Sequence, residues 1–198
     1  MTPEKYLLDL DLSTPGMHII AGPAGTGKTL ILETVADLLA TYGNQVVYVA
    51  GEELRTAAPK SINEVVVKLD TWNNDILSLM STAHALRPEA KVIVIDGDGV
   101  RLGRYGQIGQ VQVTAQNLGI SVVFSFNTWT DFRTLGLPAT LLYTYKVAQN
   151  VILLGREDRI LKLKLVATTE ADNEKKIEEE CTYKVEDLWH HTLRPITA

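Results

Sequence analysis

The residues best suited to chemistry lie together near the N-terminus, in one glycine-rich run. Three glycines, one lysine and two threonines fall within eight residues, in the order G-x-x-x-x-G-K-T. Glycines let the backbone curl so that its N–H groups point at phosphate oxygens. The lysine charge suits the outer phosphates, and the hydroxyl after it is a ligand for Mg²⁺. The spacing therefore predicts a nucleotide-binding P-loop formed by Gly22, Pro23, Ala24, Gly25, Thr26, Gly27, Lys28 and Thr29.

The residues on either side of this run fit the motif. An apolar stretch at 17–21 predicts a strand before it, and apolar residues at helical spacing over 28–42 predict a helix after it. A helix that begins at the lysine adds the positive end of its dipole to the phosphate site. The alternative is a chance match in a loop, which has no reason to lie between a strand and a helix.

Carboxylates follow two other apolar stretches. Asp96 ends the run 92–95, where an acid can support Mg²⁺ through water. The alternative is a turn, because Asp-Gly pairs are common turn formers and Gly97-Asp98-Gly99 follows. Glu52 follows the strand predicted at 45–50, where a carboxylate can polarise an attacking water molecule. The alternative for Glu52 is a surface acid in a loop.

Apolar stretches and helical patterns alternate along most of the chain, which is typical of an α/β fold. The early strands are almost wholly apolar, as expected for a parallel sheet with helices on both faces. The late strands follow one another without helices, so we expect the sheet to finish antiparallel. The predicted strands are 17–21, 45–50, 64–69, 91–95, 121–126, 150–154, 159–166 and 180–185. The predicted helices are 28–42, one that is capped by Thr71 or Asn73 and ends at Pro88, 107–118 and 138–148.

The glycine-rich run, the stretch Tyr48-Val-Ala-Gly-Glu-Glu53 and the stretch Val92-Ile-Val-Ile-Asp96 together resemble the ATPase core of RecA-like proteins. RecA and the bacterial RadA type are the most similar in layout. The resemblance implies a RecA-like P-loop NTPase core: a mostly parallel twisted sheet flanked by helices, with C-terminal antiparallel strands. We expect one domain over 1–198, with its core at 15–167 and a polar loop and edge strand at 168–198.

The resemblance also implies roles and cofactors. ATP and Mg²⁺ are the expected cofactors, with Lys28 on the β- and γ-phosphates and with Thr29 and Asp96 at the metal. Glu52 matches the glutamate that activates water. Asn127 matches the polar residue that senses the γ-phosphate and relays its presence to the next loop. Judged from the residues alone, Asn127 is equally well a helix or turn cap.

Two loops have the composition of a single-strand binding surface. In RecA-like recombinases, DNA binds to loops after the Mg²⁺ strand and after the sensor residue, which here are 99–109 and 128–137. Guanidinium groups suit phosphates, and aromatic rings stack on bases. The alternative is a pair of solvated loops whose aromatic residues fold back onto the core or onto a neighbouring subunit. The candidate DNA-binding residues are Arg101, Arg104, Tyr105, Trp129, Phe132 and Arg133.

The sequence also departs from the RecA-like pattern. These ATPases usually complete the active site with a Lys or Arg of the next subunit, after the late strand. Lys162 and Lys164 are the candidates for this trans contact, and Ala167 stands where an arginine is expected. Alternating lysines are equally a solvent-facing strand edge. The chain has the proportions of an isolated core, similar to some short bacteriophage recombinases of the strand-annealing type.

Composition limits the remaining choices. The chain has 198 residues, a net charge of −5 and one cysteine, Cys181. A chain of this size buries a core without disulfides, and a single cysteine excludes a multi-cysteine zinc site and fits a reducing cytoplasm. No apolar run is long enough to span a membrane. We expect a cytoplasmic homo-oligomer, a ring or a filament, without membrane contact.

These observations predict a Mg²⁺-dependent ATPase that acts on single-stranded DNA in recombination, repair, annealing or replication. Two alternatives stay open. One is a nucleotide-gated binding module, a loader or regulator with little turnover, which the acidic charge and the absent arginine favour. The other is a helicase motor core of the DnaB type.

Overall fold

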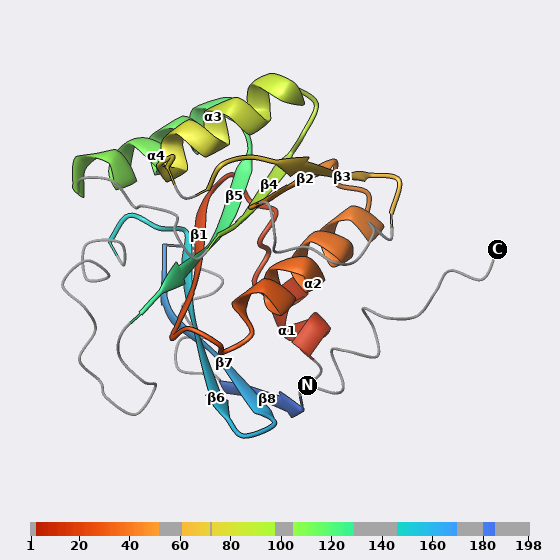
Figure 1. The fold of residues 1–198 in the computed structure, drawn as a ribbon, viewed down its shortest axis with the longest axis vertical. Coiled ribbons are helices and arrows are strands. Elements are labelled where there is room, and N and C mark those ends of the chain that lie inside the picture. Colours follow the sequence, from red (N-terminus) through yellow and green to blue (C-terminus); the bar gives the residue numbers. More distant parts are fainter. Residues whose placement is uncertain are drawn as a thin grey trace.

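The computed structural model describes residues 3–51, 61–71, 73–97, 105–128, 146–169 and 180–184. Within these ranges helices and strands alternate up to β5, except that β3 follows β2 directly, and three more strands come after β5 (Figure 1). The helices are α1 (Pro3–Asp9), α2 (Lys28–Thr41), α3 (Ile76–Leu86) and α4 (Tyr105–Leu118). The strands are β1 (Gly16–Gly22), β2 (Val46–Ala50), β3 (Glu64–Lys68), β4 (Val92–Asp96), β5 (Ser121–Asn127), β6 (Asn150–Glu157), β7 (Ile160–Thr168) and β8 (Glu180–Lys184).

The strands form one sheet of eight strands in the order β3-β2-β4-β5-β1-β6-β7-β8. Every pairing from β3 to β6 is parallel, whereas β7 runs antiparallel to β6 and to β8. The expected α/β fold, with a mostly parallel sheet and antiparallel strands at its C-terminal end, is confirmed. The carboxyl ends of β1, β2, β4 and β5 share one edge, which is where open α/β sheets bind ligands.

Helices cover both faces of the sheet, and each face has its own buried apolar cluster. Helices α1 and α2 pack on one face, against alternate strand residues that include Tyr48 and Leu163. Helices α3 and α4 pack on the other face, against residues that include Ile95 and Phe124 (Figure 1). Because both faces are covered, the central strands are buried at every position of β1, β2 and β4.

Local details differ from the sequence predictions in four places. The cap of α3 is Asp75, whose carboxylate accepts a hydrogen bond from the Ser78 backbone N–H at 2.8 Å, so the prediction of Thr71 or Asn73 is wrong. Helix α4 begins at Tyr105, so residues 105–109 of the loop predicted at 99–109 are helical. Of the helix predicted at 138–148, residues 146–148 form a turn region and the rest lie outside the described residues.

The fourth difference is helix α1, which the sequence did not predict. Its seven residues are too few to be stable alone, so packing must hold it in place. Tyr6 and Leu7 are almost fully buried in the cluster under α2. The Tyr6 hydroxyl accepts a hydrogen bond from the Leu165 backbone N–H at 2.9 Å, which ties the helix to β7.

Candidate functional site

The glycine-rich run forms the turn from β1 into α2. Gly25 and Gly27 have φ angles of 75° and 94°, in the left-handed region that side chains disfavour. Gly27 precedes the first residue of α2, Lys28, and has no side chain with which to cap the helix. The N–H groups of the first turn are therefore not capped by the side chain of the N-cap residue, which suits a phosphate site.

Backbone contacts hold the entry to this loop. A Cβ atom at Gly22 would lie 2.5 Å from the Leu154 carbonyl oxygen, so β6 approaches β1 too closely for any larger residue. On the other side, Gly22 is the register partner of Asn127, and its carbonyl accepts a hydrogen bond from the Thr128 N–H at 3.0 Å. The first glycine of the loop is therefore fixed between two neighbouring strands.

Inside the loop, polar side chains turn toward one carbonyl. The Lys28 amine and the Thr26 hydroxyl each donate a hydrogen bond to the Pro23 carbonyl oxygen at 2.8 Å. Lys28 is only 4% exposed, so its charge lies within the loop and not in solvent. A charged group desolvated in this way is strongly attracted to a phosphate anion.

Asp96 lies next to the P-loop threonine. The Thr29 hydroxyl donates to Asp96 Oδ1 at 3.3 Å, and the Ser125 hydroxyl lies 3.5 Å from the same oxygen. The Tyr48 hydroxyl donates to the other oxygen, Oδ2, at 2.9 Å. Asp96 itself is 1% exposed. The structure thus brings Lys28, Thr29 and Asp96 to one edge of the sheet, as the sequence predicted.

These residues fit a divalent cation. Mg²⁺ commonly keeps several waters and takes one or two carboxylates together with the phosphates of its nucleotide. The Thr29 hydroxyl, with its proton on Asp96, still has a lone pair for a cation, and Asp96 has an oxygen next to it. Among the described residues, no three His, Cys, Asp or Glu side chains gather as a separate metal site.

Asn127 ends β5 beside the loop. It is paired in register with Gly22, and the following residue, Thr128, is buried and bonded to that glycine. A backbone hydrogen bond thus joins the first glycine of the P-loop to the end of β5. Several residues to which the sequence assigned roles lie outside the described residues: Glu52, Arg101, Arg104, Trp129, Phe132 and Arg133. Tyr105 begins α4, and its side chain is not described.

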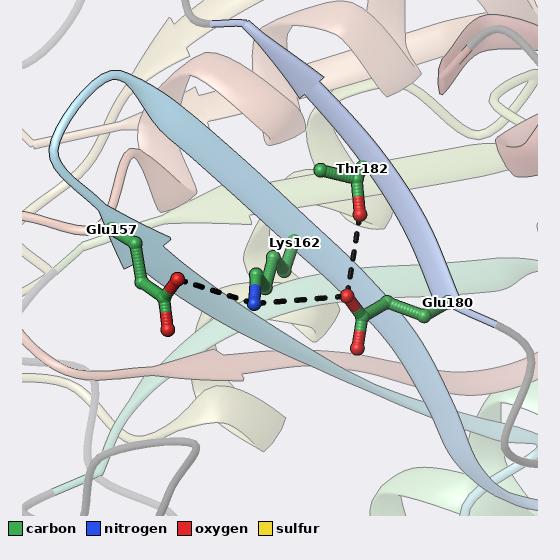
Figure 2. A network of polar contacts seen from close by, with 4 residues as sticks. All are labelled: Glu157, Lys162, Glu180 and Thr182. Carbon is green, nitrogen blue, oxygen red and sulfur yellow. Dashed lines mark hydrogen bonds and ion pairs between the residues drawn. The ribbon is translucent and has the colours of Figure 1, made fainter.

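Lys162 and Lys164, the candidates for a contact with a neighbouring subunit, lie on β7 between β6 and β8. They are therefore not on a sheet edge. The Lys162 amine lies 3.3 Å from Glu157 and 3.9 Å from Glu180, and Thr182 donates to the same Glu180 carboxylate (Figure 2). Lys162 is thus engaged within its own chain, and a trans contact stays a prediction.

Three residues near the site were missed by sequence reasoning. Tyr48 and Ser125 contact Asp96 from neighbouring strands. Arg156, on β6 close to the turn of the hairpin that β6 and β7 form, donates to the Asp158 carbonyl at 2.7 Å and to the Gly25 carbonyl at 3.4 Å. This hairpin and the outer half of the P-loop line an open hollow of about 540 Å³. The one local signal was an arginine in a polar turn, which does not by itself indicate a partner in the P-loop.

The fold and the site define a nucleotide-binding P-loop domain of the α/β class. A family model described as "AAA domain" matches residues 9–116, which is 108 of the 198 residues. The matched stretch contains the glycine-rich loop and Asp96, and it extends through most of α4. The chain belongs to this AAA domain family. No curated protein matches the chain. In the described part of the chain, no helix is long and apolar enough to cross a membrane.

Proposed function

We propose that this protein is a Mg²⁺-dependent ATPase of the RecA-like type that acts on single-stranded DNA. The observation that carries the ATPase part is the meeting of the P-loop with Asp96, whose carboxylate lies 3.3 Å from the Thr29 hydroxyl. A phosphate loop alone binds phosphate, whereas hydrolysis also needs charge neutralisation beside the transferred group. One strand, β5, lies between the P-loop strand and the Asp96 strand, and Asn127 ends it beside Gly22.

In this proposal, different residues bind the phosphates, hold the cation and orient the attacking water. Backbone N–H groups of 25–29 and the Lys28 amine bind the phosphates, and Lys28 exchanges the Pro23 carbonyl for a phosphate oxygen. A bound Mg²⁺ would neutralise charge on the outer phosphates. Thr29 and Asp96 would hold that ion, with Asp96 acting through water. Glu52 orients the water that attacks the γ-phosphate in line.

The hollow beside the P-loop gives a nucleotide room to enter. Arg156 lines it, and the two carbonyl contacts of its guanidinium hold the positive charge beside Gly25. Negative charge on a nucleotide is attracted by such a cation even before the phosphates reach the loop.

The DNA part of the proposal rests on position and composition. Thr128 is bonded to Gly22, and the loop predicted at 128–137 contains Trp129, Phe132 and Arg133. A loop in backbone contact with the phosphate site can change its conformation with nucleotide state. The paired ends of β1 and β5 therefore support a route from ATP to DNA, and we expect the working form to be a homo-oligomer.

The test is ATP hydrolysis by the full chain, measured with and without single-stranded DNA. We expect DNA to stimulate turnover, Lys28→Ala to abolish nucleotide binding, and Glu52→Gln to bind ATP without hydrolysing it. Lys91→Ala, which removes an exposed lysine ahead of β4, is the matched control and should behave as the wild type. Equal turnover in Glu52→Gln and wild type would contradict the role of Glu52.

A second candidate, a nucleotide-gated binding module with little turnover, is favoured by one observation. Lys162, a candidate for completing the active site across subunits, is paired with Glu157 and Glu180 of its own chain. Tight ATP binding with no turnover under any DNA condition would establish this candidate over the ATPase.

The DNA assignment has its own measurement. Trp129→Ala is expected to weaken single-strand affinity by about tenfold, since stacking on an aromatic ring is worth about 1–3 kcal/mol per base. Arg101→Ala and Arg104→Ala are each expected to weaken affinity and to reduce its dependence on salt, since each removes a phosphate contact. Arg87→Ala, at the end of α3, is the control for charge alone. Full affinity in all three loop variants would remove DNA from the proposal.

A further inference from the structure

The hydroxyl of Tyr48 contacts Asp96 more closely than the hydroxyls of Thr29 and Ser125 do. Its hydroxyl donates to Asp96 Oδ2 at 2.9 Å, whereas Thr29 and Ser125 lie 3.3 Å and 3.5 Å from Oδ1. Distances of 2.5–3.0 Å are usual for a strong O–H···O bond. The three contacts thus divide the carboxylate into one oxygen that is firmly held and one that faces the P-loop.

The sheet places Tyr48 for this contact. Strands β2 and β4 are neighbours, with Tyr48 paired to Val94 and Ala50 paired to Asp96. Tyr48 and Val94 belong to the buried cluster under α2, so this is the face on which the ring packs. Tyr48 is 0% exposed. A ring clamped in a packed core has little rotational freedom, and its hydroxyl is accordingly a fixed point.

Such a fixed point matters because an aspartate carboxylate rotates easily. The terminal torsion of Asp is broad and roughly two-fold, so a strand alone does not decide which oxygen faces the loop. A hydrogen bond from a rigid donor removes that freedom. With Oδ2 held by Tyr48, Oδ1 remains turned toward the Thr29 hydroxyl.

We propose that Tyr48 is a positioning residue for the divalent cation. By holding Asp96 Oδ2, it keeps Oδ1 aimed at the cation side of the P-loop, and it contacts neither nucleotide nor metal itself. This inference rests on the proposed function, because it assumes that Thr29 and Asp96 serve a cation. Partners that orient metal ligands in this way typically change metal affinity by about 10–100-fold when they are removed.

The experiment compares the full-length wild type with Tyr48→Phe, which removes only the hydroxyl. A fluorescent ADP derivative reports nucleotide binding while Mg²⁺ is titrated. The metal-free affinity is then measured by titrating the same ADP derivative in the presence of EDTA. We expect the Mg²⁺ concentration at half-saturation to rise about tenfold in Tyr48→Phe, with metal-free ADP affinity unchanged within about twofold. A purely structural role would weaken both binding reactions together.

Tyr183→Phe is the matched control. The Tyr183 hydroxyl is buried on β8 and has no hydrogen-bond partner among the described residues, so its loss removes the same group from the same apolar cluster. The control should leave the Mg²⁺ midpoint unchanged. If Tyr48→Phe is less stable than the control, the titration is made at 10 °C with ADP in excess, which favours the folded state.

The outcomes separate the two levels of the proposal. If the nucleotide affinity of the wild type does not change with Mg²⁺ concentration, the cation site is wrong, and the role of Tyr48 is wrong with it. A wild type that depends on Mg²⁺, with a Tyr48→Phe midpoint within twofold of it, would overturn the role of Tyr48 alone. A tenfold shift confined to the Mg²⁺ titration supports Tyr48 as the residue that orients Asp96.

Discussion

Two buried polar clusters lie toward opposite ends of the parallel strands, and they supply hydrogen bonds to a buried central group in different ways. The carboxylate cluster consists of Asp96, Thr29, Tyr48 and Ser125, at the carboxyl ends of the strands. The histidine cluster consists of His18, Asn150 and Thr168, with the carbonyls of Leu10 and Thr14. Both central groups are almost fully buried, so both need hydrogen bonds.

The histidine cluster is complete as it stands. The Thr168 hydroxyl donates to Asn150 Oδ1 at 2.7 Å, which fixes the orientation of the amide. The amide nitrogen then donates to His18 Nδ1 and to the Leu10 carbonyl, both at 3.1 Å. Because Nδ1 accepts, the ring proton lies on Nε2 and is donated to the Thr14 carbonyl at 2.9 Å. Each donor meets an acceptor within the fold, which is the pattern of a structural cluster.

The carboxylate cluster differs because one of its members belongs to the P-loop. An ionised carboxylate accepts hydrogen bonds at two oxygens, and one of these faces the hydroxyl of Thr29, the second residue of α2. The contacts to Oδ1 are also the long ones, at 3.3 Å and 3.5 Å. The comparison gives a rule to test: a cluster whose short hydrogen bonds end on backbone carbonyls stabilises the fold, and one that includes a P-loop hydroxyl serves a ligand.

The largest expected effect tests the ligand side of the comparison. Asp96→Asn keeps the size of the side chain and removes its charge. Since metal-assisted charge stabilisation is worth several kcal/mol, we expect ATP hydrolysis to fall by about 100-fold or more. The midpoint of thermal unfolding should change by only a few degrees. Steady-state hydrolysis and calorimetry on one preparation measure both. A large loss of stability with turnover intact would place Asp96 in the structural class instead.

The next effect concerns pH and the histidine cluster. Burial lowers the pKa of His18 from 6.5 to about 4, against opposing contributions from the Thr14 carbonyl and Asp11. The unfolded chain therefore binds a proton below pH 6.5, whereas the folded chain does not until about pH 4. Stability should fall as pH is lowered through this window, by about 3 kcal/mol if each pKa unit contributes about 1.4 kcal/mol. Urea unfolding at pH 7.5 and 4.5 measures most of this difference.

The control for the pH effect is His18→Gln, which removes the titrating ring. The variant should lose stability at pH 7.5, where the wild type gains from the cluster, and its stability should depend less on pH over the same range. If both proteins lose the same stability between pH 7.5 and 4.5, the pH dependence comes from other groups.

A smaller effect separates the clusters by function. Asn150→Ala removes the donor to His18 Nδ1 and to the Leu10 carbonyl, whereas the Thr168 hydroxyl keeps the Gln149 carbonyl at 3.0 Å as an acceptor. We therefore expect a loss of about 2 kcal/mol in the free energy of unfolding. Nucleotide affinity should stay within about twofold of the wild type. Asn74→Ala, at an exposed position, is the control and should cost about 0.5 kcal/mol or less. Weaker nucleotide binding in Asn150→Ala would show that the two clusters are energetically coupled and would contradict their separate roles.

The two clusters also differ in how far the sequence foretold them. Asp96 was found because an apolar run ended in an acid downstream of a P-loop, and β4 confirms that run. The contact between Tyr48 and Asp96 was not predicted from the sequence, because it depends on β2 lying beside β4. Sequence periodicity gives the strands but leaves their order in the sheet open. The histidine cluster joins residues 132 positions apart, and nothing near His18 indicates its partner.

Helix ends show a second limit of the sequence. Thr71, Asn73 and Asp75 are all good capping residues ahead of α3, and only the path of the backbone selects Asp75. Helix α1 is held by the burial of Tyr6 and Leu7, which no local pattern in seven residues reveals. The order of elements could thus be predicted from local periodicity, whereas contacts between distant elements could not.

The smallest expected effect compares two hydroxyl contacts within the carboxylate cluster, those of Ser125 and Tyr48 with Asp96. Ser125 lies 3.5 Å from Asp96 Oδ1, which is beyond the range of a strong hydrogen bond, and Tyr48 lies 2.9 Å from Oδ2. Ser125→Ala should therefore change the Mg²⁺ midpoint by about twofold or less. Both residues are buried neighbours of one carboxylate, and they differ in the length of the contact and in the oxygen that they contact. A Ser125→Ala shift as large as that of Tyr48→Phe would show that all three hydroxyls orient Asp96 together, and that no single donor fixes it.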